Sequence, residues 1–209
     1  MKASNPLISK IPVCAFAIMA MLSLILFGAP LFAQMMGLPV DLSYLSQRAD
    51  IIVQGKVQSV RNEPLPGYSH IPTIAVTLEV EKMLRGPSVK TFTFREILLD
   101  RRPKLGKHGY EAGQRLFLFL PSPSAQGVSS PIGMEQGRFH IARDAAGAET
   151  IINEVGNSGL FKNVAQKASN AGAKLTPNQL RTASTKGGPV HLDEFISLTQ
   201  KLTSLPRIK

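Results

Sequence analysis

Few side chains in this sequence have the types and spacing that catalysis or metal binding requires. None of the histidines has a second histidine or a carboxylate at the spacing of metal ligands, and the four are His70, His108, His140 and His191. The sequence also lacks a Gly-x-Ser-x-Gly motif and an evident Ser-His-Asp set, so a hydrolase has no visible nucleophile. We therefore expect a protein that is not an enzyme and that holds neither a metal nor a cofactor.

Glu79 and Glu81 lie two residues apart, as paired acid and base carboxylates can. Hydrophobic Leu78 and Val80 alternate with them, and alternate residues of a strand point to opposite faces. The two carboxylates are therefore expected to be surface charges on the solvated face of a strand.

The densest basic stretch of the chain is interrupted by Glu96 and Asp100 and contains glycine and proline, which favour a loop. Loops are a common place for partner contacts, and clustered cations attract phosphate or sulfate groups. Tyr110 is the nearest aromatic side chain that could stack on a ligand. The predicted binding surface comprises Arg95, Arg101, Arg102, Lys104, Lys107 and Tyr110.

The N-terminal residues resemble a targeting segment. Lys2 and Lys10 precede an uncharged apolar run from Ile11 to Ala33, and no acidic residue lies in this part. We expect a signal peptide over residues 1–33, cleavage after Ala33, and a mature protein in the periplasm or outside the cell. The alternative is an uncleaved inner-membrane anchor, because about 20 apolar residues span a bilayer.

Export limits how the mature part can be stabilised and what it can bind. Cys14 is the only cysteine, so the mature chain must fold without disulfides. Loss of Lys2 and Lys10 lowers the formal charge from +10 to +8, since 22 basic and 14 acidic residues remain. A basic surface favours anionic partners such as acidic polysaccharide. We do not expect nucleic acid, because we expect the protein to be exported, and we expect membrane contact only if the N-terminal segment is retained.

Strict alternation of hydrophobic and polar residues predicts a mostly β domain. Asp41 is expected to cap a short helix over residues 42–49. Gly55 suggests a bulge in the first strand, and a turn at Arg85–Ser88 joins the second and third strands in a hairpin. The segment 114–120 is apolar on both faces and is expected to be central. The expected strands are 50–60, 74–81, 89–94, 114–120, 137–143 and 150–155.

Helical spacing replaces the alternation from Gly159 onward. Residues 160–168 have the spacing of a helix, and Thr176 with Gln179 resembles a capped helix start. Residues 192–202 form an amphipathic pattern that packs on its own domain or on a partner. We expect a barrel domain over residues 34–158 and a helical extension over residues 159–209.

Four segments in order carry a resemblance to a known family: ADIIVQGKVQSV, LEVEKMLRGP, VKTFTF and GYEAGQRLFLFL. Residues 42–143 are similar to the netrin module and to the tissue inhibitors of metalloproteinases. They also resemble exported bacterial proteins with the patterns found here at residues 55–57, 84–86 and 135–139. The resemblance implies a mainly β (β+α) fold: an OB-like small closed barrel of five to six strands, with a short N-terminal helix and C-terminal helices.

The resemblance does not carry the inhibitory mechanism, because those inhibitors chelate the protease zinc through an N-terminal cysteine that this mature chain lacks. A fold shared by many binders does not fix a function. The leading expectation is a non-enzymatic exported protein of the cell envelope that binds a protein or an anionic glycan. The alternatives are a regulator or inhibitor of a secreted peptidase, and a membrane-anchored structural envelope protein.

Overall fold

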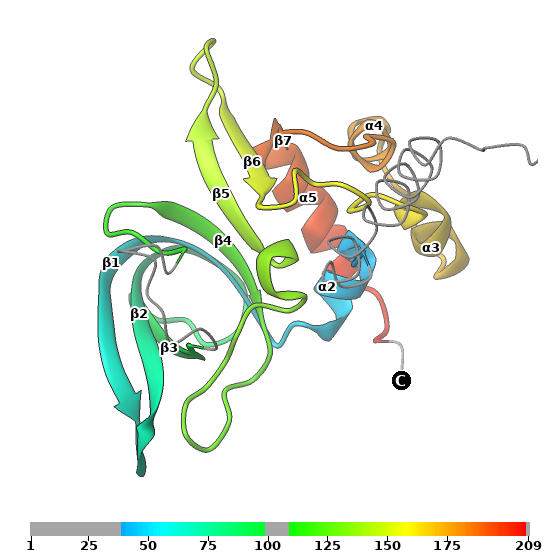
Figure 1. The fold of residues 1–209 in the computed structure, drawn as a ribbon. Coiled ribbons are helices and arrows are strands. Elements are labelled where there is room, and N and C mark those ends of the chain that lie inside the picture. Colours follow the sequence, from blue (N-terminus) through cyan, green and yellow to red (C-terminus); the bar gives the residue numbers. More distant parts are fainter. Residues whose placement is uncertain (1–38, 99–108, 208–209) are drawn as a thin grey trace, which may run out of the picture. The chain divides into compact units, whose positions relative to one another are not determined.

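The computed structural model describes residues 39–98 and 109–207, so the expected signal or anchor segment lies outside the described residues. The described part is mainly β with several helices, as the sequence predicts (Figure 1). Its elements follow in the order α2 (Leu42–Arg48), β1 (Ile51–Leu65), β2 (Tyr68–Arg85), β3 (Thr91–Ile97), β4 (Arg115–Leu120), η2 (Met134–Gln136), β5 (Arg138–Arg143), β6 (Glu149–Asn153), α3 (Val164–Asn170), α4 (Pro177–Ala183), β7 (Val190–His191) and α5 (Leu192–Thr203).

All seven strands belong to one sheet in the order β3-β2-β1-β4-β5-β6-β7, and every neighbouring pair is antiparallel. The predicted closed barrel of five to six strands is therefore wrong. Closure would require the two ends of the sheet to pair, but within the described ranges the edges β3 and β7 form no ladder with each other. The sheet continues through β5 because that strand occupies the second edge of β4.

The outer edge of β3 contacts a loop instead of a strand. Arg95 forms an isolated parallel bridge with Val128, and Ser129 N donates to Arg95 O at 2.8 Å. Ser129 Oγ in turn donates to Pro121 O at 2.8 Å, which fixes the loop that follows β4. This loop satisfies part of an edge that would otherwise be free to pair with another chain.

The first hairpin is longer than the sequence predicts. The prolines after residue 60 indicated a loop, yet β1 continues to Leu65 and only a tight turn separates it from β2. Pro64 lies opposite Pro72 in the ladder, in a part of β1 that extends beyond its pairing with β4. Proline is tolerated there because it removes no bond to a second neighbouring strand.

Gly55 produces the irregularity expected of it. The ladder between β1 and β2 shifts register between Gln54 and Gly55. A Cβ atom at Gly55 would lie 2.5 Å from Glu79 O, so no larger residue fits without a shift of the backbone. The predicted bulge in the first strand is confirmed, as is the hairpin of β2 and β3, in which Leu78 lies opposite Phe92.

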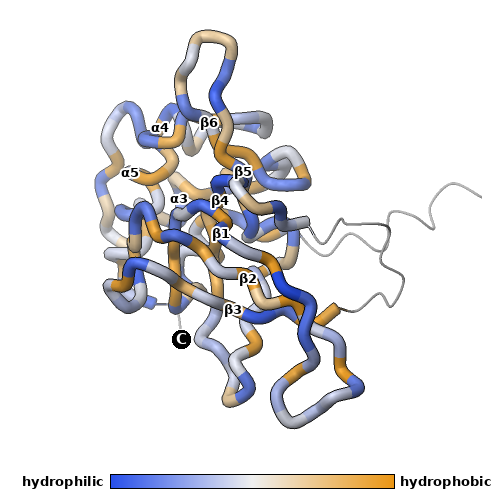
Figure 2. Tube along the Cα trace, turned by 90° about the vertical axis from the view of Figure 1, so that its left-hand side faces the viewer, coloured by the Kyte–Doolittle hydropathy of each residue, from blue (hydrophilic) through white to orange (hydrophobic). Residues whose placement is uncertain are grey.

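Two hydrophobic clusters share strand β4. The sheet core, packed against one face, consists of Ile51, Val53, Val57, Ile74, Val76, Leu78, Phe92, Phe94, Tyr110, Leu116, Leu118 and Leu120. The helix core, on the other face, is centred on Phe117, Phe119, Phe139 and Phe195 and includes residues of all the helices α2 to α5. Figure 2 shows the hydrophobic stretches of the strands in the middle of the sheet. The prediction that residues 114–120 are apolar on both faces is confirmed.

Helix α5 packs on its own sheet, as the amphipathic pattern predicts. The ring centroid of Phe195 lies 5.3 Å from that of Phe117 and 5.1 Å from that of Phe139. The predicted cap of α4 is also present, since Thr176 and Gln179 form a complete capping box. No helix within residues 39–98 or 109–207 has the length and apolar character needed to cross a membrane.

Helix α3 begins at Val164, later than the spacing of residues 160–168 predicts. Gly159 and Asn163 both have positive φ, which interrupts a right-handed helix. Leu160 and Phe161 are nevertheless buried in the helix core from a turn. The hydrophobic positions were therefore read correctly, and the backbone conformation before Val164 was not.

Arg85 joins the ends of two helices to strand β2. Its guanidinium donates to Ser46 O and Ala49 O at 2.7 Å, at the end of α2, and to Thr203 O at 2.8 Å, at the end of α5. The last carbonyl groups of a helix lack intrahelical donors and carry partial negative charge. A single cation thus satisfies both helix ends, although partial burial lowers the pKa of Arg85.

Candidate functional site

The predicted binding surface divides into described and undescribed parts. Arg95 lies on β3 in an ion pair with Glu63, and 20% of its side chain is exposed. Tyr110 is buried, with 3% exposed, and therefore offers no free ring face to a ligand. Four predicted residues lie outside the described residues, namely Arg101, Arg102, Lys104 and Lys107. The basic surface thus stays a prediction.

A buried hydrogen bond connects the two sides of the undescribed segment 99–108. Tyr110 Oη donates to Glu96 Oε2 at 2.8 Å, so residues near the end of β3 and just before β4 are held together. The guanidinium carbon of Arg138 lies 4.8 Å from the centroid of the Tyr110 ring, a distance suited to a cation–π interaction. We name Glu96, Tyr110 and Arg138 the loop base.

Burial controls the protonation of the loop base. Burial raises the pKa of Glu96, while the hydrogen bond from Tyr110 and the charge of Arg138 act in the opposite direction. Burial and the neighbouring carboxylate also raise the pKa of Tyr110, so its hydroxyl keeps its proton. Tyr110 is thus a hydrogen-bond donor that stabilises the chain at this point rather than a stacking platform.

A chain of polar contacts leads from the loop base along β5. Arg138 Nη2 lies 3.4 Å from Glu154 Oε1, and the same carboxylate contacts His140 Nε2. Gln114 Nε2 lies 2.7 Å from His140 Nδ1. Burial alone would raise the pKa of Glu154, but the contacts with His140 and Arg138 lower it overall.

The contact between His140 and Glu154 resembles part of a catalytic set, but the third component is missing from the described residues. Both ring nitrogens of His140 contact an amide or a carboxylate, whereas an acid–base histidine in nucleophilic catalysis contacts a hydroxyl or thiol. No group of three or more His, Cys, Asp or Glu residues in the described ranges is arranged to hold a metal. The arrangement links β5 to β4 and to the residue that follows β6.

Sequence reasoning missed Arg138, His140 and Glu154 as a set. Arg138 and His140 are two residues apart on β5 and therefore share a face. That spacing was a usable signal, but Glu154 follows β6, and only the antiparallel pairing of β5 with β6 brings it to them. The contacts among these three side chains therefore depend on which strands pair in the sheet.

Glu79 and Glu81 are exposed, as the alternation predicts. Glu81 receives hydrogen bonds from Arg115 at 2.8 Å and from Gln54 at 2.6 Å. Arg115 also pairs with Glu149 on β6. The hydrogen bond from Arg115, which outweighs partial burial, lowers the pKa of Glu81. These contacts cross-link strands β1, β2, β4 and β6.

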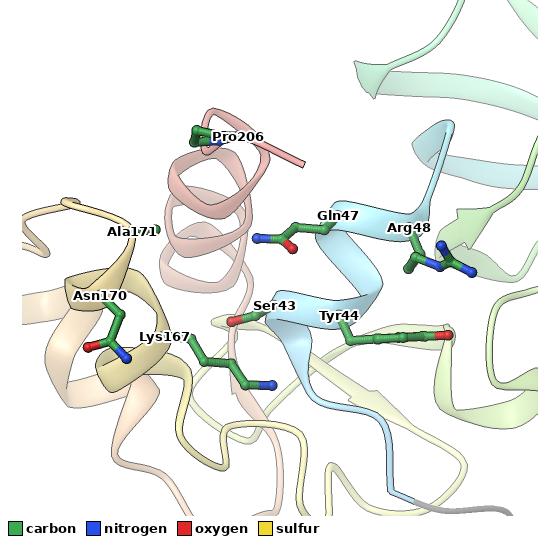
Figure 3. A pocket seen from close by; sticks show the side chains of 8 residues that line it. All are labelled: Ser43, Tyr44, Gln47, Arg48, Lys167, Asn170, Ala171 and Pro206. Carbon is green, nitrogen blue, oxygen red and sulfur yellow. The ribbon is translucent and has the colours of Figure 1, made fainter. Parts of the chain in front are cut away.

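A groove of about 560 Å³ lies between α2, α3 and the C-terminal residues (Figure 3). Its volume is within the range of small-ligand sites. In Figure 3 the side chains of Ser43 and Gln47 extend from α2 toward α3, whereas those of Tyr44 and Arg48 extend away from it. We name it the α2/α3 groove; it is lined by Ser43, Tyr44, Gln47, Arg48, Lys167, Asn170, Ala171 and Pro206.

The described residues form an antiparallel β protein in which helices cover one face of the sheet, with a buried polar loop base and a small groove. No protein-family model matches the chain, and no curated protein matches it in sequence. Function must therefore be argued from the described side chains and from the charge of the sequence.

Proposed function

We propose that this chain is a non-enzymatic exported protein that binds an anionic polysaccharide of the cell envelope through basic residues 101–107. The observation that carries the proposal is the hydrogen bond of 2.8 Å between Tyr110 and Glu96. It joins the two sides of a short segment that contains four cations and one acid, Asp100.

The joined ends set an upper limit on how far these cations can lie from Glu96 and Tyr110. An extended chain spans at most about 3.6 Å per residue, so the middle of the segment, seven residues from each, can lie at most roughly 25 Å away. Repeating anionic groups along a polysaccharide meet several such cations at once. Clustered cations raise the rate of encounter and the affinity for a polyanion more than dispersed ones do.

Two described cations near the segment, Arg95 and Arg138, already contact carboxylates. Arg95 is paired with Glu63, and Arg138 is 9% exposed and contacts Tyr110 and Glu154. Binding charge therefore comes from residues 101–107, supported by a net charge of +8 after loss of the N-terminal segment. The apolar run of residues 11–33 supports export, and a relationship of residues 42–143 to netrin modules remains part of the proposal.

Retention of the purified protein on alginate, a polymer of uronic acids, tests the proposal, with neutral dextran as the reference. We expect binding to alginate that weakens as salt is added, because screening acts on exposed charges. The combined change Arg101→Gln, Arg102→Gln, Lys104→Gln and Lys107→Gln should lower the affinity by about tenfold or more, since each exposed ion pair contributes a few tenths of a kcal/mol.

A matched variant separates a defined surface from general charge. Four exposed lysines elsewhere provide it: Lys90, Lys162, Lys174 and Lys186, each changed to Gln. This control removes the same charge and should keep most of the affinity. Equal losses in both variants, or no loss in the first, would contradict the proposal.

Two other outcomes would favour the alternatives raised by the sequence. Recovery of a secreted peptidase with the protein from envelope extract, resistant to salt, would support a peptidase regulator. N-terminal sequencing of the natural protein decides between cleavage before Gln34 and a retained membrane anchor. A start at Met1 would favour a membrane-anchored structural protein.

A further inference from the structure

A long stretch of the helical part carries positive charge and no negative charge. No acidic residue lies between Glu154 and Asp193, a range that contains α3, α4 and the turns around them. In Figure 1 these two helices lie on the side of α5 that is farther from β1, β2 and β3. A surface of one charge sign attracts partners of the opposite sign. The cations of this stretch are Lys162, Lys167, Lys174, Arg181 and Lys186.

Three of these five cations are available to a partner. Lys167 and Arg181 pair with carboxylates of neighbouring elements. The other three are exposed and make no ion pair within the part of the chain that the structure describes, and they are Lys162, Lys174 and Lys186. The first precedes α3, the second separates α3 from α4, and the third follows α4. Cations distributed in this way suit a wide anionic surface better than a single small anion.

One large hydrophobic side chain of the stretch is exposed. Leu180 on α4 lies between Lys174 and Lys186 in sequence, and 45% of it is exposed. Protein segments that lie on a bilayer combine lysines with hydrophobic residues that enter the boundary between headgroups and acyl chains. A leucine gains more from contact with acyl chains than from contact with a hydrated, hydroxyl-covered polymer. This residue therefore favours a bilayer over a polysaccharide at the surface of α3 and α4.

The described chain begins next to this stretch. Leu42 N donates to Leu160 O at 2.7 Å, and a Cβ atom at Gly159 would lie 3.1 Å from Pro39 Cβ. Only residues 34–38 separate Pro39 from the apolar run that the sequence predicts to enter the membrane. This connection spans at most about 22 Å. A bilayer that holds the apolar run, before cleavage or permanently, is therefore close to the start of the acid-free stretch.

We infer that the surface of α3 and α4 binds an anionic phospholipid bilayer. Lys162, Lys174 and Lys186 contact the headgroups, and Leu180 enters the boundary with the acyl chains; we name these four residues the lysine face. Three unpaired cations without a neighbouring acid in the sequence match the negative charge of such a bilayer. The lysine face is separate in sequence from residues 101–107, so the inference does not rest on the proposed polysaccharide binding.

Brief acetylation of the natural protein, read out by mass spectrometry, tests which lysines a bilayer covers. Vesicles of equal parts phosphatidylglycerol and phosphatidylcholine should protect Lys162, Lys174 and Lys186, whereas vesicles of phosphatidylcholine alone should not. Exposed lysines of the sheet side are the internal control and should react equally in all samples: Lys56, Lys82 and Lys90. Equal protection of both sets, equal protection by both kinds of vesicle, or no protection at all overturns the inference.

The combined change Lys162→Gln, Lys174→Gln and Lys186→Gln tests the charge of the lysine face. Each lysine near an anionic bilayer strengthens binding by roughly fivefold, so vesicle sedimentation should show that the preference for anionic over neutral vesicles falls by about a hundredfold. The matched variant removes the same charge from the sheet side and should keep most of the preference: Lys56→Gln, Lys82→Gln and Lys90→Gln. Equal losses in the two variants would contradict a defined face.

Leu180→Gln separates a bilayer from other polyanions. We expect it to lower the affinity for anionic vesicles by about threefold, because a half-exposed leucine loses its contact with acyl chains, and to leave alginate binding unchanged. Val89, 41% exposed between β2 and β3, supplies the control Val89→Gln, which should keep the vesicle affinity. Unchanged vesicle affinity in Leu180→Gln, or protection of the lysine face by alginate as strong as that by vesicles, would overturn the assignment to a bilayer.

Discussion

The sheet core and the helix core lie on opposite faces of β4 and are built in different ways. The sheet core comes from strands that follow one another closely, so that β1, β2 and β3 pair in sequence order. The helix core joins α2, near the start of the described chain, with α5 at its end. Local alternation therefore specifies the first core, and contacts between distant segments specify the second.

The buried polar groups of the two cores differ in type, and both sides include atoms without a partner in the described chain, with Arg95 Nε and Arg138 Nε on the side of the sheet core. At the margin of the sheet core, Tyr110 and Glu96 satisfy each other by a hydrogen bond. On the helix side, Ser46 and Thr199 are fully buried and their hydroxyls have no partner in the described chain. Packing between α2 and α5 thus tolerates unsatisfied hydroxyls that a hydrophobic residue of similar size could replace.

The largest effect should follow truncation of β4 on either face. Phe119→Ala empties the centre of the helix core, where the ring lies 5.4 Å from Phe117 and 5.7 Å from Phe139. We expect a loss of about 3–5 kcal/mol in the free energy of unfolding, and about 2–5 kcal/mol for Leu118→Ala in the sheet core. Urea denaturation followed by circular dichroism measures both, since the protein has no tryptophan.

Because β4 is common to both cores, each variant should unfold in a single transition. Exposed Met134 serves as the control, and Met134→Ala should change stability by no more than about 0.5 kcal/mol. Two separate transitions in Phe119→Ala would show that the sheet core folds without the helices, so that β4 does not couple the two cores.

The next largest effect should come from Arg85, which ties the helix side to β2. Arg85→Met keeps much of the side-chain volume but removes the donors to three carbonyl groups at the ends of α2 and α5. We expect a loss of about 2–3 kcal/mol, because bonds to a charged donor are strong and the carbonyls are partly buried. Thermal unfolding measured by calorimetry reports the change.

Arg61, exposed on β1, provides the reference for this substitution. Arg61→Met should alter stability by about 0.5 kcal/mol at most. Equal behaviour of the two variants would mean that the cation at the helix ends contributes nothing beyond its hydrocarbon contacts.

The smallest effects should appear in the pH dependence of two glutamates. Burial raises the pKa of Glu96 above the ordinary 4.5, so its contribution to stability is present below that value and is lost as pH rises through its folded pKa. Glu96→Gln should therefore stabilise the protein at pH 7 relative to the unmodified chain. The difference should fade near pH 4, in urea denaturation repeated across pH.

Glu81 should behave in the opposite way. The hydrogen bond from Arg115 lowers its pKa below 4.5, so its contribution is present above that value and is lost as pH falls through the folded pKa. Glu81→Gln should cost up to about 1 kcal/mol at pH 7, as expected for a partly exposed ion pair, and nothing in strong acid. The same sign for both variants would contradict the contrast between buried and exposed carboxylates.

Sequence reasoning succeeded where a pattern is local. The alternation of residues 74–81, the two apolar faces of β4 and the capping box at Thr176 each depend on neighbours within a few residues. It failed at the distal part of the first hairpin, where prolines indicated a loop. A strand that lacks a neighbour on one side accepts prolines, and single-sequence reasoning does not know which strands have such an edge.

The candidate sites show the same limit. Tyr110 stood out as an aromatic residue beside a basic stretch, but burial against Arg138 and Glu96 gives it a different role. The sequence did not indicate the groove lined by Ser43, Gln47 and Asn170, because α2 and α3 are more than a hundred residues apart. Their proximity requires the helix core.

By itself, the sequence determined the mainly β character of the chain, the positions of most strands and helices, and the absence of cysteine from residues after Cys14. These follow from side-chain period and composition, which act over short distances. The tertiary structure decided that the sheet stays open, with β5 beside β4, and which polar side chains meet. Such choices depend on the free energy of burying distant hydrophobic surfaces together, and no local pattern encodes that free energy.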